Sequence, residues 1–206
     1  MRTRTLSSFA LVALLATAGC TSGSEPADDR TEEQTSEQAA ATDGSGMDGW
    51  LCDDISPASL ETLAGGELTD PTEVQVQDDD EAWVCEARDG QTPLARVTLR
   101  VGEEARDEAR ERVEQTEGVE PGPEYLGESY TSPALVVGLT LCRVTEGGPD
   151  DHQPYVMLAE SLVDSEEDLS EPLRSTLAQL AGGLDQRYGC SPTMARSDAA
   201  EATEAP

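Results

Sequence analysis

The sequence of 206 residues contains no lysine and no asparagine, a single histidine and a single phenylalanine. Without lysine, no residue can form a Schiff base, and the S-x-x-K arrangement of transpeptidases and β-lactamases is excluded. No serine stands in a G-x-S-x-G nucleophile elbow, and no glycine-rich phosphate-binding loop is present. The lone histidine, His152, lies in the hydrophilic segment 147–153, where we expect an exposed side chain. The sequence therefore offers no common catalytic or nucleotide-binding motif.

The N-terminus carries one short apolar stretch. Residues 6–16 are apolar apart from two serines, and Arg2 and Arg4 precede them. The stretch is too short for a transmembrane helix, which requires roughly 20 apolar residues. A positive segment followed by a short apolar one is typical of a secretory signal. We therefore predict that residues 1–19 are a signal peptide.

The end of this segment, Ala18-Gly19-Cys20, resembles the lipobox of bacterial lipoproteins. In that family the chain is cut before the cysteine, whose sulfur carries a diacylglyceryl group. The resemblance implies lipidation of Cys20, and two acyl chains suffice for stable anchoring where one gives only marginal binding. The alternative is cleavage at the A-x-A site formed by Ala16-Thr17-Ala18, which would leave a soluble product with a free thiol at Cys20.

The cysteine count favours lipidation. The chain has five cysteines, an odd number for a secreted protein, and lipid on Cys20 would leave four to pair. Of the three possible pairings we predict Cys52–Cys85 and Cys142–Cys190. No C-x-x-C motif is present and the spacings are wide, so a redox centre or a zinc site is disfavoured. We predict no cofactor.

The charge is strongly one-sided, with a formal net charge of -30 at pH 7. Such a surface repels nucleic acid and anionic headgroups and attracts cations or basic partners. Solubility is the simplest reason for so much acid. The acidic turn 78–81, which Asp150 and Asp151 could assist, leaves calcium binding open, although EF-hand spacing is missing.

Composition divides the chain into a folded part and two polar segments. Residues 20–46 comprise the cysteine and a flexible acidic tether without aromatic residues, which cannot bury enough apolar surface to fold. We expect one extracytoplasmic domain at residues 47–193 and a disordered acidic tail at 194–206.

The order of elements in the domain predicts an α+β fold: an antiparallel sheet of about five strands, two disulfides, and helices packed mainly on one face. Strands are predicted at residues 72–77, 82–87, 94–101, 134–144 and 153–163, and segment 118–132 as a loop. Helices are predicted from Ser56-Pro57 to Gly65-Gly66, over 103–115, and along the leucine stripe 169–184, which Gly182-Gly183 weakens.

Two packing details follow from the pattern. Helix 103–115 has a narrow apolar stripe, so we expect it to lie loosely on the surface, supported by Glu108–Arg112 and Asp107–Arg110 pairs. Gly138 shares a strand face with Cys142, so we expect the C-terminal helix to approach the sheet closely there.

A longer segment resembles the opening of uncharacterised actinobacterial cell-surface lipoproteins. It comprises residues 50–60, including Cys52 before a short helix, and Trp83 and Cys85 on a strand. The resemblance covers residues 20–101, and it implies a lipoprotein of the cell surface with no assigned catalytic residue.

Together these features predict a membrane-anchored lipoprotein on the extracellular face of the cell membrane. We expect a non-enzymatic binding or accessory module, with an envelope protein or small ligand as partner and no nucleic acid. The alternatives are an envelope-acting hydrolase that uses His152 or an acidic pair, and a structural spacer.

Overall fold

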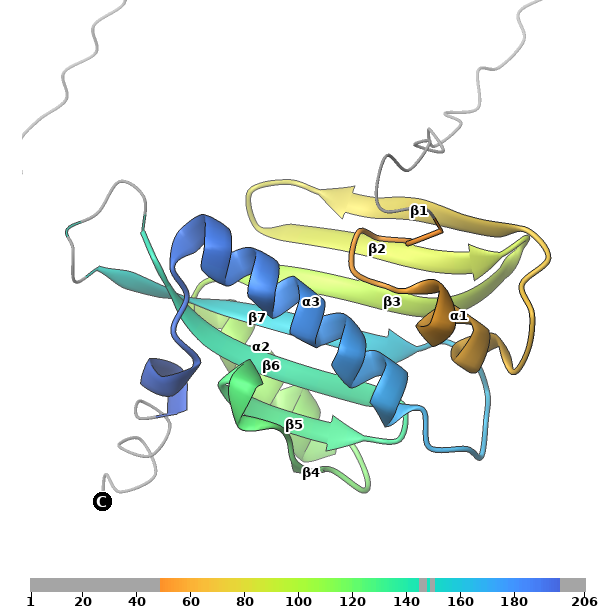
Figure 1. The fold of residues 1–206 in the computed structure, drawn as a ribbon. Coiled ribbons are helices and arrows are strands. Elements are labelled where there is room, and N and C mark those ends of the chain that lie inside the picture. Colours follow the sequence, from red (N-terminus) through yellow and green to blue (C-terminus); the bar gives the residue numbers. More distant parts are fainter. Residues whose placement is uncertain (1–48, 145–147, 149–150, 197–206) are drawn as a thin grey trace, which may run out of the picture. The chain divides into compact units, whose positions relative to one another are not determined.

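The computed structural model describes residues 49–144, 148 and 151–196 (Figure 1). The chain divides into two units, Met1–Glu37 and Gln38–Pro206, and the second contains all described residues. The predicted signal peptide, Cys20, the tether 20–46 and most of the predicted tail lie outside the described residues. In the part of the chain that the structure describes, no helix has the length and apolarity needed to cross a membrane.

One antiparallel sheet of seven strands forms the centre of the domain, in the order β1-β2-β3-β7-β6-β5-β4. The strands are β1 Pro71–Asp78, β2 Ala82–Asp89, β3 Thr92–Val101, β4 Glu120–Pro121, β5 Glu128–Ser132, β6 Leu135–Arg143 and β7 His152–Ser161. The α+β class and the antiparallel pairing are confirmed, but five strands was too few. The additional strands, β4 and β5, lie in the segment predicted as a loop, because their polar sequence lacks an alternating apolar pattern.

Most helices lie on one face of this sheet, as predicted, and one lies on the other face. Helix α3, Ser170–Tyr188, crosses one face with α1, Pro57–Ala64, beside it, and α2, Glu103–Gln115, lies on the opposite face (Figure 1). A short 3₁₀ helix, η1 Glu124–Leu126, also contacts α3.

Each face has its own hydrophobic core because side chains alternate along the strands. On β6, Val136 and Cys142 belong to the core under α1 and α3, whereas Val137 and Leu139 belong to the core under α2. The leucines of α3 supply the larger core, as the leucine stripe predicts: Leu173, Leu177, Leu180 and Leu184. Full burial of a leucine contributes about 2 kcal/mol.

The helix ends follow from local sequence. The Ser56 side chain accepts a hydrogen bond from the Ser59 amide and caps α1, and Pro57 occupies the first turn. Gly65 and Gly189 end α1 and α3 in the left-handed conformation that glycine adopts without strain.

Both predicted disulfides are present, Cys52–Cys85 and Cys142–Cys190. The first ties the segment before α1 to β2, and the second ties the residue after the C-cap of α3 to β6. Cys52, Cys85 and Cys142 are almost fully buried. The four cysteines of the domain are therefore structural.

Helix α2 is held more firmly than expected, because its arginines pair with glutamates of the sheet. Arg110 binds Glu128 of β5 through two hydrogen bonds, of 2.9 and 2.6 Å, and Arg112 pairs with Glu160 of β7. In the described residues neither Glu108–Arg112 nor Asp107–Arg110 forms an ion pair, since Glu108 pairs with Arg100 of β3. The predicted pairs were therefore wrong.

Two further expectations are corrected. A Cβ at Gly138 would lie 3.2 Å from Leu126 and 3.0 Å from Met157, so the glycine accommodates η1 and not α3. Residues 192–196 form a helical turn with Ala195 buried and Arg196 paired to Glu124, so the folded domain continues past residue 193.

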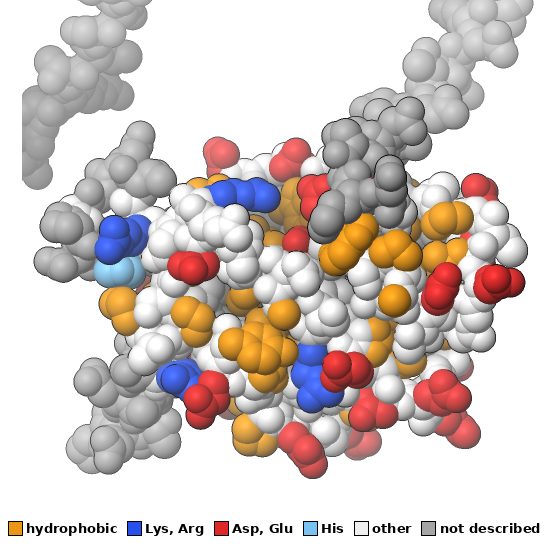
Figure 2. Space-filling view, viewed as in Figure 1, with side chains coloured by type: hydrophobic (Ala, Val, Ile, Leu, Met, Phe, Trp, Pro, Cys, Tyr) orange, Lys and Arg blue, Asp and Glu red, His pale blue; other side chains and the backbone are white. Residues whose placement is uncertain are grey.

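The face of the domain that carries α1 and α3 is rimmed by acidic side chains (Figure 2). Patches of arginine side chains are few, and hydrophobic side chains appear as small separate patches. No single charged region on this face indicates where a ligand binds.

Candidate functional site

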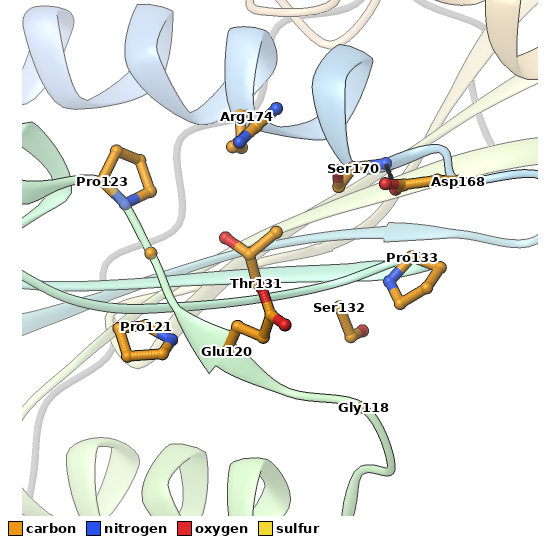
Figure 3. Close-up of a pocket in the computed structure, with 11 residues that line it drawn as sticks. Gly118, Glu120, Pro121, Pro123, Thr131, Ser132, Pro133, Asp168, Ser170 and Arg174 are labelled. Atoms are coloured by element: carbon orange, nitrogen blue, oxygen red, sulfur yellow. Dashed lines mark hydrogen bonds between the residues drawn. The ribbon is translucent and has the colours of Figure 1, made fainter.

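A cavity of about 530 Å³ lies between the β4–β5 region and the start of α3 (Figure 3). Three of its polar side chains already have structural partners. Asp168 accepts a hydrogen bond from the Ser170 amide, Arg174 pairs with Glu171, and the Ser132 hydroxyl donates to the Leu135 carbonyl. Asp168 and Arg174 thus have structural roles, whereas Thr131 Oγ1 is buried without a hydrogen bond among the described residues.

A smaller cavity, of about 290 Å³, has polar groups without such partners. It lies between α3, the loop 51–55 and the ends of β1, β2 and β3, and we call it the Asp54 cavity. It is lined by Asp53, Asp54, Asp78, Trp83, Leu99, Leu180, Gly183, Leu184, Arg187 and Tyr188.

The sheet supplies one wall of the Asp54 cavity. Asp78 of β1, Trp83 of β2 and Leu99 of β3 are direct cross-strand partners, so their side chains lie in one row on one face. Trp83 and Leu99 are half-buried and pack against the core under α3. In this row the Asp78 carboxylate lies at the edge of the sheet, and the side chains of Trp83 and Leu99 lie nearer its centre.

Helix α3 supplies the opposite wall. Leu180, Gly183, Leu184, Arg187 and Tyr188 recur every three or four residues, which places them on one stripe of the helix. Leu180 and Leu184 are buried, and the Tyr188 ring lies 5.7 Å from that of Tyr155. Arg187 Nη2 lies 4.0 Å from the point where a Cβ of Gly183 would stand, so the guanidinium folds back along the helix beside the cavity.

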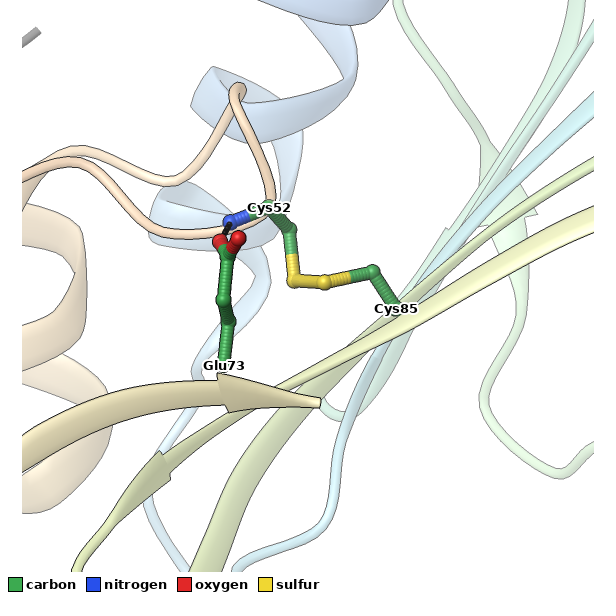
Figure 4. A group of neighbouring side chains, drawn as sticks. All are labelled: Cys52, Glu73 and Cys85. Atoms are coloured by element: carbon green, nitrogen blue, oxygen red, sulfur yellow. Dashed lines mark hydrogen bonds between the residues drawn. A yellow bond between two sulfur atoms is a disulfide. The ribbon is translucent and has the colours of Figure 1, made fainter. Parts of the chain in front are cut away.

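The third wall is the loop 51–55, which is fixed at both ends. Leu51 and Ile55 exchange two backbone hydrogen bonds, of 3.1 and 2.9 Å. Cys52 is bonded to Cys85, and its amide donates to the Glu73 carboxylate (Figure 4). The loop is thereby anchored to β1 and β2.

The same loop holds two non-glycine residues in the left-handed region, Cys52 with φ 52° and Asp53 with φ 58°. Such a conformation costs on the order of 1 kcal/mol or more for each residue, and it persists where the surroundings impose it. Here the disulfide and the Leu51–Ile55 bridge impose it. The strained turn presents Asp53 and Asp54 to the cavity.

Asp54 is exceptional among the acids of the described residues. The other buried or half-buried carboxylates all accept hydrogen bonds or pair with arginine: Glu73, Glu86, Asp89, Glu128 and Glu160. Asp54 is half-buried, yet in the described part of the chain its carboxylate has no hydrogen bond and no ion pair.

Electrostatics separate Asp54 from the paired acids. Burial, and then the charge of Asp53, raise the pKa of Asp54 from 3.8 to about 7, while the charge of Arg187 acts in the opposite direction. For Glu86, hydrogen bonds from Arg96 and Arg88 lower the pKa instead. An unpaired carboxyl group in a cleft with a shifted pKa is typical of a functional site.

Other groups around the cavity are unpaired as well. Within the described residues, the exposed Arg187 forms no ion pair, and the side chains of the half-buried Trp83 and Tyr188 donate and accept no hydrogen bond. The cavity thus combines opposite charges and two polar aromatic rings with an apolar floor of leucines. This combination can bind a small ligand that has both polar and apolar parts.

A metal is not favoured by the donor geometry. The described residues bring Cys52, Glu73 and Cys85 together at ligand distance, but both sulfurs are in a disulfide and cannot act as thiolate ligands (Figure 4). In the turn predicted as a possible calcium site, Asp79 accepts hydrogen bonds from Gln77 and from the Glu81 and Ala82 amides. That carboxylate shapes the β1–β2 turn.

The sequence-predicted site residues are found in separate places. The four paired cysteines lie in the core, and Cys20 is outside the described residues. His152 is the first residue of β7, is half-buried and does not line the Asp54 cavity. Asp151 accepts a hydrogen bond from the Gly148 amide, and Asp150 is outside the described residues.

Sequence reasoning missed Asp54 and Arg187 as site residues. One signal was available: Trp83 shares a strand face with Cys85, so a Cys52–Cys85 bridge brings the residues after Cys52 near Trp83. The position of Arg187 depends on how α3 crosses the sheet, which the sequence pattern does not specify.

Comparisons of this chain with protein-family models, with curated proteins and with solved structures found no match.

Proposed function

We propose that this protein is a membrane-anchored extracytoplasmic lipoprotein, held by lipid on Cys20, whose domain is a non-enzymatic module that binds a small ligand in the Asp54 cavity. The cysteine arrangement carries the proposal. The four cysteines of the described domain pair with one another, so Cys20 is the one cysteine left for another chemistry. Disulfides are typical of oxidising compartments outside the cytoplasm, which agrees with the signal-like N-terminus.

The binding function is supported by the Asp54 cavity. A rigid, bridged loop and two regular elements form its walls, and the polar groups facing it lack partners within the described residues. Preformed cavities with a few unsatisfied polar groups are the usual setting of small-ligand sites. The absence of a nucleophile motif in the sequence favours binding over catalysis.

Anchoring is tested by partitioning. In a bacterial host that processes lipoproteins, we expect the full chain in the membrane fraction and in the detergent phase after Triton X-114 extraction. Cys20→Ser should move it to the aqueous phase, while the neighbouring control Ser22→Ala should not. Recovery of the wild-type chain from the aqueous phase would argue against the anchor.

An envelope-acting hydrolase is a second candidate, favoured by one observation. A carboxyl group with a pKa of about 7 suits a general acid or base near neutrality, and Asp54 has one. Turnover of envelope material by the wild-type chain, lost in Asp54→Asn, would select this alternative over the binding module.

A further inference from the structure

We propose that the Asp54 cavity binds a zwitterion of amino-acid size, with the ligand ammonium group at Asp54, its carboxylate at Arg187, and its apolar side chain against Trp83 and the α3 leucines. This inference rests on the binding function proposed above and names the ligand class.

The charges of the cavity give the first argument. Asp54 and Arg187 line the same space and influence each other, yet they form no ion pair within 4 Å. A ligand that is only cationic would leave Arg187 unpaired, and one that is only anionic would leave Asp54 unpaired. A zwitterion satisfies both, through charge-assisted hydrogen bonds that are about twice as strong as neutral ones.

Gly183 gives the second argument. A glycine in a helix interior costs about 1 kcal/mol relative to alanine, and two of them stand side by side in α3. A Cβ at Gly183 would touch nothing nearer than Arg187 Nη2 at 4.0 Å, so close packing does not require glycine there. Glycine at this position instead keeps volume open in the wall beside Arg187.

The remaining walls define the ligand's size and its apolar part. A volume of about 290 Å³ lies near the lower end of ligand pockets, which admits a molecule the size of one amino acid. Trp83, Leu180 and Leu184 offer a hydrophobic surface for a side chain. Asp53 and Asp78 are exposed carboxylates at the cavity, and they favour the ammonium end over a neutral amide.

Three probes that carry both charges, only the ammonium, or only the carboxylate test the assignment. We would titrate the purified full chain, with its disulfides intact, with L-leucine, L-leucinamide and N-acetyl-L-leucine at pH 7, about one unit below the pKa of an α-amino group, by calorimetry and Trp83 fluorescence. A Trp50→Phe background leaves Trp83 as the single tryptophan reporter. L-leucine should bind about tenfold or more tightly than either singly charged probe, since each lost charge-assisted contact costs at least a factor of that order.

Two variants assign the contacts. In Arg187→Gln, L-leucine should bind no more tightly than L-leucinamide. In Asp54→Asn, L-leucine should bind no more tightly than N-acetyl-L-leucine. Asp185→Asn and Arg174→Gln are charge-matched controls outside the Asp54 cavity, and they should leave all three affinities unchanged. Gly183→Leu should abolish binding while the chain stays folded, because the side chain fills the cavity.

The outcomes separate this inference from the broader function. If L-leucinamide binds as well as L-leucine and Arg187→Gln has no effect, the zwitterion is wrong while a binding site at Asp54 stands. If none of the three probes binds, the ligand class is overturned. Membrane partitioning through Cys20 does not depend on this cavity and decides the anchor independently.

Discussion

Asp54 is the residue on which the candidate site depends, and its protonation should be visible in the stability of the domain. In the folded state the pKa of its carboxyl is raised to about 7, against 3.8 for an exposed aspartate. Between these values the folded chain keeps a proton that the unfolded chain has lost. The contribution of Asp54 to the free energy of unfolding therefore falls as pH rises from about 4 to about 7, and is constant above.

Asp54→Asn replaces the titrating carboxyl group of Asp54 with an amide that does not titrate. The variant should match the wild type near pH 4 and exceed its stability above pH 7, by on the order of 1–2 kcal/mol once solvent screening is allowed for. The charged and titratable groups at the same cavity are Asp53, Asp78, Arg187 and Tyr188. Urea unfolding of both chains between pH 4 and 8 measures the difference, and a difference that does not change with pH would contradict the prediction.

Single residues also show where sequence reasoning succeeds and where it stops. The Cys52–Cys85 and Cys142–Cys190 pairs were predictable because each joins two elements that the sequence pattern had located. These are the segment before α1 with β2, and the end of α3 with β6. The meeting of Asp54 with Arg187 was not, because it depends on a left-handed turn at Cys52 and Asp53 and on the path of α3. Neither leaves a periodic signal in the sequence.

At the scale of elements, the ion pairs between α2 and the sheet should stabilise the domain more when their glutamates are buried. Glu128 is 10% exposed and receives two hydrogen bonds from Arg110, whereas Glu171, the partner of Arg174 on α3, is 81% exposed. Both pairs join an arginine of a helix to a glutamate, so they form a matched comparison.

Arg110→Ala should lower the free energy of unfolding by about 2 kcal/mol, because it leaves the Glu128 carboxylate buried without a partner. Arg174→Ala should lower it by less than about 0.5 kcal/mol, because Glu171 stays hydrated. Chemical denaturation at pH 7 compares the two. Equal losses in both variants would show that burial of the glutamate does not matter.

Elements with a strong period were predictable and the others were not. The leucine stripe predicted α3, and the strand predicted at residues 94–101 is β3. Strand β5 has the sequence Glu-Ser-Tyr-Thr-Ser, and its pairing with β6 outweighs its weak pattern. Arg110 and Arg112 of α2 pair with Glu128 of β5 and Glu160 of β7, and the sequence does not show that these strands lie under the helix.

For the whole molecule, the two disulfides should supply a large part of the stability. They close loops with sequence separations of 33 and 48, and the chain-entropy model gives about 4 kcal/mol for each. Replacing either pair by alanines should lower the urea midpoint strongly, while Cys20→Ser should leave it unchanged. A midpoint insensitive to loss of both bridges would show that the two cores alone hold the domain together.

The central claim is that Cys20 carries lipid while the other four cysteines are bonded to one another outside the cytoplasm. Intact-mass analysis of the full-length gene product, extracted from membranes and treated with an alkylating agent without reduction, tests it most directly. We predict a chain that begins at Cys20, carries the mass of a diacylglyceryl group, and takes up no alkyl group. An unlipidated N-terminus, or alkylation at any of the four domain cysteines, would contradict the account.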